Sequence, residues 1–337
     1  MPNSSPTWGV VATVDEPAIL IAAFVRHHLT IGAHAVHIFL DRKNEAARDM
    51  LAPIERCYVT ECDQNYWNES GLSRRPPRHT ARQKFNAEQA QALGMTDWLL
   101  HCDADEFVTD GSVVFDDLSG ANDRCVIIRN FERVYTPTAN QKGQDAKLFD
   151  GAFREPIEMF DLVSEPLFGE FAPMLKYGFS GHVGGKAFVP KGAPWSMGVH
   201  RAHVRGTNER APSREGRSLF YHFDGLTRLH FLLKILKRGY ETPDGPKRKM
   251  GSQRILQAIY AREHAHDRHK MTTVTQALKA LTTDQVAFYE GFQSLNQTPF
   301  GPQGCAGLDL SAASFDACLR AENAELLDMA GLSYFGD

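Results

Sequence analysis

The chain lacks several features that would place it quickly in a class of proteins. It has no basic excess, because 37 lysines and arginines stand against 41 acidic residues and the net charge is −4. Proteins that bind nucleic acid usually carry a clear positive surplus, so this balance argues against a nucleic-acid partner. No apolar run approaches the roughly 20 residues that a helix needs to cross a membrane.

Pairs of closely spaced cysteines are also missing. The six cysteines are scattered and include no C-x-x-C pair, which indicates reduced thiols rather than a disulfide framework or a zinc site. The opening Met-Pro-Asn-Ser-Ser-Pro has neither the basic head nor the apolar core of a signal peptide. We therefore expect a cytoplasmic protein. Its 42% hydrophobic and 23% charged residues are typical of a globular chain.

The amino-terminal third alternates between two periodicities. Short apolar runs that end at polar residues predict buried strands over 8–14, 35–40, 57–60 and 97–102. Helical spacing follows Pro17, and it returns from Thr80 to a stop at Gly94. Strands that alternate with helices predict a parallel sheet covered on both faces. The predicted fold class is therefore α/β, with a Rossmann-like, mostly parallel central sheet flanked by helices.

The pattern changes in the second half of the chain. Short strands are expected over 186–190 and 196–203, and an amphipathic helix over 226–238. The remainder predicts further helices over 252–270, 272–293 and 311–329. We therefore expect an α/β domain over 1–240 and a helical C-terminal extension over 241–337.

Three aspartates stand at the ends of predicted strands: Asp15, Asp41 and Asp103. In open parallel sheets ligands bind outside the carboxyl ends of the strands, so these acids should surround one crevice. Asp103-Ala-Asp-Glu106 directly follows a nearly uncharged strand, and adjacent carboxylates are costly unless a cation is bound. Two carboxylates two residues apart in an extended chain also point to the same side.

A hard divalent cation held by carboxylate oxygens can act as a Lewis acid and neutralise a diphosphate leaving group. The sequence therefore predicts a metal site at Asp103 and Asp105. The alternative is a pair of acids on a solvated turn.

Five segments carry a family resemblance: Arg26-His-His-Leu-Thr-Ile-Gly32, Ala81-Arg-Gln-Lys-Phe-Asn86, Asp97-Trp-Leu-Leu-His-Cys-Asp-Ala-Asp-Glu-Phe107, Gly198-Val-His200 and Tyr221-His222. Together they resemble glycosyltransferases of the GT-A type, in the family 2-like group related to family 92. The resemblance implies a GT-A domain over 1–240 and a UDP- or GDP-sugar donor. It also implies transfer to a hydroxyl acceptor, with inversion, in glycan or polysaccharide synthesis.

The resemblance also implies roles for single residues. Asp103 and Asp105 would bind the metal, and Asp15 and Asp41 would approach the nucleoside of the donor. Arg82 would face the donor from the start of its helix. His200, or else His222, would complete the metal shell or touch the diphosphate. A histidine ligand favours Mn²⁺ over Mg²⁺.

Other candidates have both a functional and a structural interpretation. Lys186 follows two glycines, but the spacing is not that of a phosphate loop, so we expect at most a lone lysine near the diphosphate. A long loop is expected over 61–79, and its part Arg74–His79, beside Tyr66 and Trp67, would either contact sugar and phosphate or be solvated. The basic run Pro246–Met250 would either make a peripheral contact with an anionic membrane or be simply exposed.

An inverting transfer needs a base for the acceptor hydroxyl, and the sequence does not choose among Glu155, Glu158, Asp161, Glu165, Glu170 and His182. The acceptor classes left open are glycans, lipid-linked glycans and proteins. Two other functions stay open as well: a metal-dependent nucleotidyltransferase, and a non-catalytic protein that binds a nucleotide-sugar or carbohydrate on the same fold.

Overall fold

A computed structural model describes residues 5–72, 74–121, 124–137, 147–240, 252–333 and 335. The chain forms two compact units, each assembled from separate stretches. The first comprises Met1–Asn130, Gly184–Tyr221 and Pro302–Leu308. The second comprises Phe131–Val183, His222–Gly301 and Asp309–Asp337.

The first unit is built on a mixed sheet. Its central strands lie in the order β8-β4-β1-β2-β3, with bounds Lys186–Pro190, Trp98–His101, Trp8–Val14, Ala35–Leu40 and Cys57–Glu61. The pairs β4-β1, β1-β2 and β2-β3 are parallel, and β8 runs antiparallel to β4. The α/β fold class with a Rossmann-like sheet is therefore confirmed, and its first four strands in the chain pair in parallel.

Beyond β8 the sheet of this unit continues through strands of the middle of the chain. The amino-terminal half of β6 (Cys125–Val134) pairs antiparallel with β8. Strand β11 (Ser213–His222) pairs with both β6 and β5 (Glu106–Val108). The strand β5 that follows the acidic segment is thereby fixed within the sheet of the first unit.

Two helices position the strands that carry the candidate site. Helix α1 (Ala18–Thr30) begins after Pro17 and contacts β2 and β5, with Phe24 packed edge-on against Phe107 at 5.9 Å. Helix α4 (His79–Leu93) ends at Gly94 in the left-handed conformation, as the stop signal predicts. Ala87 and Ala90 of α4 pack with residues of β1 and β4 in one buried cluster. The remaining helices of this unit are α2 (Glu45–Leu51), α3 (Gln64–Glu69) and α5 (Gly111–Ser119).

Two segments of the first unit differ from the prediction. The stretch over 61–79 contains α3, which Asp63 caps by accepting a hydrogen bond from the Tyr66 amide, where the sequence suggested loop. The strand expected over 196–203 is a short hairpin instead, with β9 (Trp195–Ser196) paired to β10 (His203–Val204). A tight turn separates them, because a Cβ on Gly198 would lie 2.0 Å from the Arg201 carbonyl oxygen.

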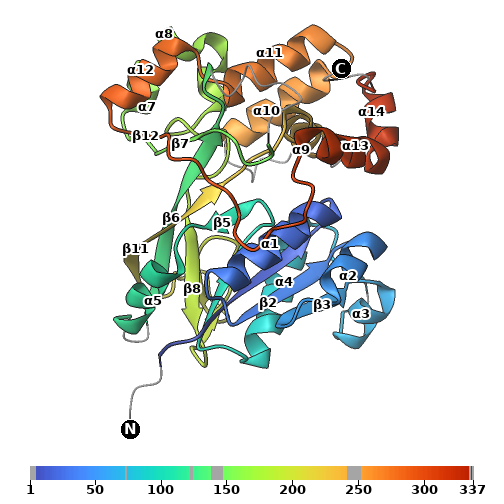
Figure 1. The fold of residues 1–337 in the computed structure, drawn as a ribbon, viewed down its shortest axis with the longest axis vertical. Helices are drawn as coiled ribbons and strands as arrows, with labels where there is room; N and C mark the ends of the chain where they lie inside the picture. The colour runs from blue at the N-terminus through green and yellow to red at the C-terminus, as the bar shows by residue number, and fades with distance from the viewer. Residues whose placement is uncertain are drawn as a thin grey trace. The chain divides into compact units, whose positions relative to one another are not determined.

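The second unit is mainly helical. Its strands are β7 (Ala152–Arg154), which pairs with the carboxyl-terminal half of β6, and β12 (Leu295–Asn296), which pairs with β7. Helix α9 (Arg228–Gly239) packs against α10, α11 and α13 (Figure 1). Its other helical elements are α7 (Phe160–Val163), α8 (Glu165–Phe168), η2 (Gly169–Met174), α10 (Ser252–Glu263), α11 (Arg268–Lys279), α12 (Thr283–Gly291), α13 (Ala312–Glu322) and α14 (Ala324–Met329).

The C-terminal helices are shorter and more numerous than predicted because polar residues cap new starts. The expected helix over 272–293 is two helices, since Thr282 and Gln285 form a capping box that begins α12. Asp267 caps α11 in the same way, which ends the expected helix over 252–270 early. Asn323 separates α13 from α14.

The expected domain boundary at residue 240 stays a prediction. The two compact units are defined by spatial contact, and each is made of several stretches of the sequence. The basic run Pro246–Met250 lies outside the described residues. Among the described helices, none has the length and apolar content to cross a membrane.

Gly111 marks a close approach between α5 and the end of α1. A Cβ at this position would lie 1.7 Å from the carbonyl oxygen of Ile31, a backbone atom that cannot easily move. We expect Gly111→Ala to destabilise the first unit by about 3 kcal/mol or more, because overpacking against backbone forces a shift of one helix. Thermal unfolding followed by tryptophan fluorescence measures this.

The matched control is Gly120→Ala at the end of the same helix, where the nearest atom, Arg214 Nη2, is 3.8 Å from the added carbon. That variant should unfold within about 0.5 kcal/mol of the wild type. Equal effects of the two substitutions would contradict the assignment of the close contact at Gly111.

Candidate active site

The acidic segment follows β4 at the point where the strand order of the sheet reverses. The chain passes from β1 to β2 and β3 on one side of β1, and then returns to place β4 on the other side. Because β1, β2 and β4 are parallel, Asp15, Asp41 and Asp103 follow strand ends at the same edge of the sheet. Ligands of open α/β sheets bind at such a reversal, outside the carboxyl ends of the strands.

Asp103 is held at both carboxylate oxygens. Gln83 of α4 donates from Nε2 to Oδ1 at 2.5 Å, and Lys186 of β8 donates from Nζ to Oδ2 at 3.1 Å. The Asp103 side chain is 30% exposed, whereas Lys186 is fully buried. A carboxylate offers about four acceptor sites, so these two bonds orient Asp103 and leave it able to accept a cation.

Lys186 also contacts the buried carboxylate of Glu106. Its Nζ lies 3.0 Å from Glu106 Oε2, which in turn accepts a hydrogen bond from the Asp103 amide at 2.8 Å. Complete burial raises the pKa of Glu106 to about 7, an effect that the charge of Lys186 only partly offsets. The Asp103 and Glu106 carboxylates outweigh burial at Lys186 and raise the pKa of its ammonium well above the usual value. Lys186 thus supplies fixed positive charge beneath the acidic segment.

The acidic segment itself is a turn and not an extended chain. The Glu106 amide donates to the carbonyl oxygen of Asp103 at 3.0 Å, which closes a four-residue turn. The argument that residues two apart point to the same side therefore does not apply to Asp103 and Asp105. Asp105 is 2% exposed within this turn.

Asp41 is paired with arginines of the following helix and loop. Arg82 donates to both carboxylate oxygens, from Nε and Nη2, at 2.6 Å each, and Arg75 Nη2 lies 2.8 Å from Oδ2. Burial alone would raise the pKa of Asp41, but the hydrogen bonds and charge of Arg82 lower it below its usual value. Arg82 Nη1 also donates to the carbonyl oxygens of Pro76 and Pro77. Arg82 and Asp41 together hold the loop that contains Arg74–His79 against the sheet edge.

Asp15 and His200 complete the predicted set in the first unit. Asp15 accepts a hydrogen bond from Arg42, and its side chain is 32% exposed. His200 Nδ1 lies 3.2 Å from the carbonyl oxygen of Gly185, the residue before Lys186. A carbonyl can only accept, so Nδ1 of the neutral ring carries the proton and the lone pair is on Nε2. Metal-binding histidines commonly show this arrangement.

Sequence reasoning missed two residues that the structure brings to the strand end. Gln83 contacts Asp103, and it is one of three polar residues of α4 that face the sheet, with Arg82 on Asp41 and Asn86 on Thr13. His101 is 2% exposed and its Nδ1 lies 2.9 Å from the Gly198 carbonyl oxygen. Burial, followed by the charge of Lys186, lowers the pKa of His101 to about 4, so this ring is neutral. Polar residues on the buried face of α4 were the available signal.

The aromatic residues beside the arginine loop belong to the core. Trp67 is fully buried in the cluster that contains Ala87 and Leu99, and its indole N–H donates to the Cys62 carbonyl oxygen. Tyr66 donates from its hydroxyl to Asn86 at 2.7 Å. These contacts favour the structural interpretation of both rings over sugar stacking.

Several candidates belong to the second unit. His222 is 3% exposed and its ring lies 4.7 Å from that of His182, and burial lowers the pKa of His222 well below its usual value. Of the acids considered as a base, Glu155 is half-buried, and the exposed ones are Glu158, Asp161, Glu165 and Glu170. The choice of a base stays open.

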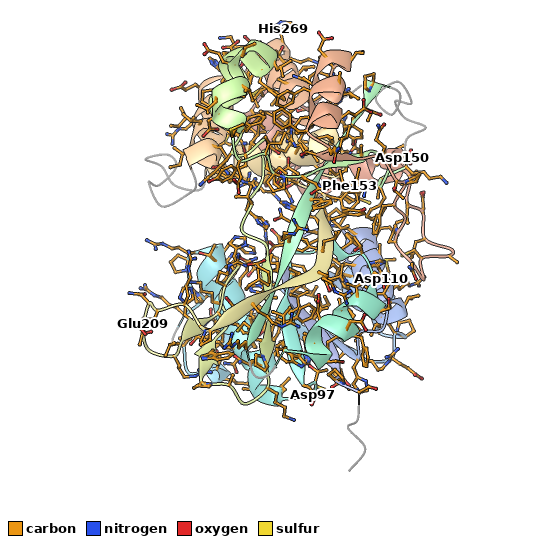
Figure 2. All side chains as sticks on the ribbon, turned by 90° about the vertical axis from the view of Figure 1, so that its left-hand side faces the viewer. Asp97, Asp110, Asp150, Phe153, Glu209 and His269 are labelled. Atoms are coloured by element: carbon orange, nitrogen blue, oxygen red, sulfur yellow. The ribbon has the colours of Figure 1, made fainter. Side chains whose placement is uncertain are left out.

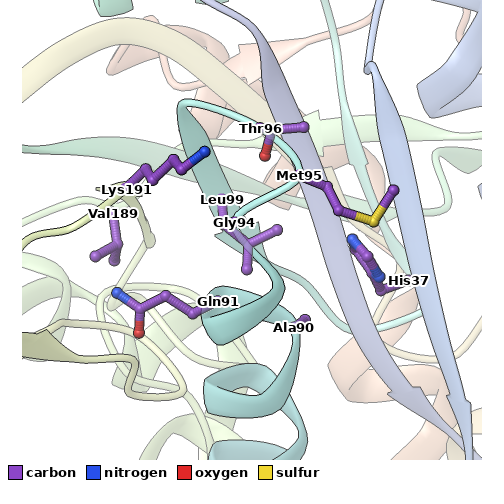
Figure 3. Close-up of a pocket in the computed structure, with 9 residues that line it drawn as sticks. All are labelled: His37, Ala90, Gln91, Gly94, Met95, Thr96, Leu99, Val189 and Lys191. Atoms are coloured by element: carbon purple, nitrogen blue, oxygen red, sulfur yellow. The ribbon is translucent and has the colours of Figure 1, made fainter.

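A small pocket lies at the opposite end of β4 from Asp103. It is lined by Gly94, Thr96, Lys191 and neighbouring residues (Figure 3), and its volume is about 10 Å³. Such a volume holds about one water molecule. Asp97 (Figure 2) directly precedes β4 at this end, and its carboxylate accepts hydrogen bonds from the amide and the hydroxyl of Thr7. This end of the sheet is therefore structural.

Removal of the Lys186 charge should destabilise the first unit in a pH-dependent manner. In Lys186→Met the Glu106 carboxylate loses its buried counter-charge, and its pKa in the folded state rises further above the unfolded value. A raised carboxyl pKa does not change the free energy of unfolding at pH values below the unfolded-state pKa. It lowers that free energy progressively as pH rises from the unfolded-state pKa to the folded-state pKa. We expect a loss of about 2 kcal/mol at pH 8 and under about 1 kcal/mol at pH 5.

Urea unfolding at the two pH values measures this difference. The exposed Lys191, just beyond the end of the same strand, provides the control Lys191→Met, which should be neutral at both pH values. An equal loss for Lys186→Met at pH 5 and pH 8 would contradict the account.

No protein-family model matches the chain, and no curated protein matches it in sequence. Solved structures match at low identity. A glucosyl-3-phosphoglycerate synthase from Mycobacterium tuberculosis, solved with Mn²⁺, UDP-glucose and phosphoglyceric acid, is 12% identical over 55% of this chain and 57% of that one, with a TM-score of 0.30. A nucleotidyl transferase from Methanothermobacter thermautotroptrophicus is 10% identical over 39% of this chain and 62% of that one, with a TM-score of 0.26.

A galactosyltransferase solved with donor and acceptor sugar analogues is 14% identical over 54% of this chain and 57% of that one, with a TM-score of 0.25. The matched regions thus span 57 to 62% of the length of these three structures. Two glycosyltransferases, one of them solved with Mn²⁺ and UDP-glucose, are therefore among the structures similar to this chain, together with a nucleotidyl transferase. At these identities and scores the function has to be argued from the chain's own residues.

Proposed function

We propose that the protein is a metal-dependent glycosyltransferase that transfers a sugar from a UDP- or GDP-sugar to a hydroxyl acceptor. The observation that carries this proposal is the position of the acidic turn. Asp103 and Asp105 follow β4 at the reversal of strand order, and Gln83 and Lys186 hold Asp103 from two other elements. A solvated turn would not need this support, since exposed acids are satisfied by water.

The donor set suits a hard divalent cation. Asp103 and Asp105 offer carboxylate oxygens, which Mg²⁺ and Mn²⁺ both accept, and a contribution from His200 Nε2 would favour Mn²⁺. When bound, the cation supplies Lewis-acid stabilisation of the charge that develops on a diphosphate leaving group. Gln83 and Lys186 keep the Asp103 carboxylate oriented.

The acids at the neighbouring strand ends suit the rest of a nucleotide donor. Asp15 follows β1 beside the proposed metal ligands, and it accounts best for a nucleoside contact because its carboxylate is partly exposed. Asp41 is committed to Arg82 and Arg75, so its contribution is to fix the loop with Arg74–His79. Two further arginines of that loop, Arg74 and Arg78, are exposed and suited to phosphate or sugar oxygens.

Gln83 should act as a positioning residue for the metal ligand. Gln83→Leu removes the hydrogen bond to Asp103 Oδ1 and keeps a side chain of similar size. We expect the affinity for Mn²⁺ to fall about tenfold or more, as for other residues that orient a ligand. Mn²⁺ titration by calorimetry measures the loss. Gln91→Leu, on the same helix, is the control and should bind Mn²⁺ as the wild type does. The same loss in both variants would assign the effect to the helix and not to the Asp103 contact.

The test of the function is donor turnover across a panel of UDP-, GDP- and CDP-sugars. Binding and slow hydrolysis of each donor are measured with Mn²⁺, with Mg²⁺ and with a chelator. Metal-dependent release of a nucleoside diphosphate from one donor would establish the class and identify the donor. In a parallel assay with a nucleoside triphosphate and a sugar 1-phosphate, release of pyrophosphate would indicate a nucleotidyltransferase. Donor binding without turnover would indicate a binding protein, and binding of no donor would overturn the proposal.

A further inference from the structure

A polar pocket in the first unit lies away from the acidic turn. Its volume is about 140 Å³, and it opens to solvent. It is formed by the start of β6, the start of β11 and the segment that leads into β11, with lining residues Cys125, Ile127, Arg201, Arg210, Ser213 and Glu215. The surface near this segment carries Glu209 (Figure 2). None of the sequence-based assignments includes these residues.

Arg201 is the unusual member of the pocket. Its side chain is half-buried, and its Nη1 is buried without a hydrogen-bond partner in the part of the chain that the structure describes. Burial lowers the pKa of Arg201 below its usual value, and Arg210 adds to this effect while Glu215 opposes it. A buried guanidinium donor without an acceptor destabilises the folded state. Such groups in native proteins usually have a partner, which can be protein, ordered water or a bound ion.

The lining selects the chemistry of that acceptor. A guanidinium presents a planar fork of N–H donors that matches the oxygens of a carboxylate or phosphate. Arg210 supplies a second positive charge in the same pocket, and Glu215 supplies one negative charge. The net charge of these three groups therefore favours an anion, while Glu215 limits how strongly it is held.

The size of the pocket restricts the ligand further. About 140 Å³ is well below the 300 Å³ or more of sites for drug-sized ligands, so a whole nucleotide-sugar does not fit. A single carboxylate or phosphate group does fit.

We propose that this pocket binds a compact oxyanion, the carboxylate or phosphate monoester group of a small ligand, through Arg201 with support from Arg210. The pocket is connected to the acidic turn through β8. A Cβ on Gly185 would lie 3.6 Å from Arg201 Nη1, and the next residue is Lys186. The proposed binding needs neither a donor nor a divalent cation, so it stands apart from the proposed transferase activity.

The experiment is a titration with inorganic phosphate and, separately, with acetate, followed by calorimetry and by NMR without metal or donor. We expect wild-type protein to bind at least one of the two, and Arg201→Gln to weaken that binding about tenfold or more. Glu215→Gln removes the pocket's negative charge and should tighten binding several-fold. Phosphate alone as a ligand would indicate a phosphate monoester, and acetate alone a carboxylate.

Two controls separate this site from other positive charges. Arg217→Gln alters an exposed arginine of β11 that pairs with Asp116, and it should leave the affinity unchanged. Asp105→Asn should also leave it unchanged, because the acidic turn is not part of the pocket. The proposal is overturned if neither anion binds, or if Arg201→Gln and Arg217→Gln bind it equally. Circular dichroism of each variant checks that it is folded.

Discussion

Asp105→Asn is expected to lower kcat/KM for donor consumption about a thousandfold. The substitution removes one negative charge from the turn that follows β4 and leaves the size of the side chain nearly unchanged. Lewis-acid stabilisation of a leaving group is worth several kcal/mol, and 4 kcal/mol corresponds to about a thousandfold in rate. The measurement is release of nucleoside diphosphate from the donor identified in the panel, as a function of Mn²⁺ concentration.

The metal dependence distinguishes a lost ligand from a damaged fold. If Asp105 binds the cation, the variant should require a higher concentration of Mn²⁺ and should unfold close to the wild-type midpoint. Asp110→Asn is the matched control, because Asp110 is exposed and caps α5 through the Ser112 amide, a role that asparagine fills equally well. Full activity of Asp105→Asn, or an equal loss in Asp110→Asn, would remove Asp105 from the proposed metal site.

The parallel part of the sheet could be predicted because local pattern decides it. Strands β1, β2 and β4 are short apolar runs that are buried on both faces, and such runs show little ambiguity. The same logic placed Asp15, Asp41 and Asp103 at one edge, since parallel strands end on the same side. The antiparallel strand β8 was also predicted, over 186–190, at its observed bounds. The hairpin of β9 and β10 was not predicted, because it depends on a turn at Gly198.

The partners of the acidic turn could not be predicted because they are distant in sequence. Lys186 reaches Asp103 from 83 residues away, and nothing near it in the sequence indicates a buried ion pair. The cost of adjacent carboxylates was correctly recognised, but part of the compensating positive charge comes from this lysine. The same contact gives Lys186 a structural role that a search for phosphate loops cannot reveal.

The second unit was the least predictable part of the chain. It is assembled from three stretches, and two of them contribute to a cluster of buried charges. Glu132 comes from β6, Arg154 from β7 and Lys279 from the end of α11, and each is at most 1% exposed at its side chain. In the sequence these residues are isolated charges that lie far apart, and a surface position would explain each of them equally well.

Glu132→Gln should therefore destabilise the second unit by about 3–5 kcal/mol. Glu132 Oε1 accepts from Arg154 Nη2 at 2.5 Å and from the Ser180 amide at 3.0 Å, with Lys279 Nζ at 3.5 Å. Oε2 accepts from the Gly181 amide at 2.5 Å. In glutamine, one carboxylate oxygen is replaced by an NH₂ group, which would face the N–H groups that now donate to Glu132. The buried cations Arg154 and Lys279 would also lose the negative charge beside them.

This loss should shrink in acid, as that of Lys186→Met does, but over a lower range of pH. Burial alone would raise the pKa of Glu132, but Lys279 and Arg154 lower it to about 2 from an ordinary value of 4.5. A lowered carboxyl pKa gives stability that is present above pH 4.5 and is lost as pH falls toward 2. The difference between wild type and Glu132→Gln should accordingly be largest near neutral pH and shrink in acid.

Hydrogen exchange of the Ser180 and Gly181 amides is the appropriate measurement, because all four tryptophans (Trp8, Trp67, Trp98 and Trp195) belong to the first unit. Exchange there should accelerate in Glu132→Gln, while tryptophan fluorescence should report a smaller change. Glu158→Gln, at an exposed position of the same unit, controls for the charge alone. If both amides kept wild-type protection in Glu132→Gln, the buried charges would be satisfied without this carboxylate. A cluster that depended on the carboxylate could not protect these amides from exchange once it was removed.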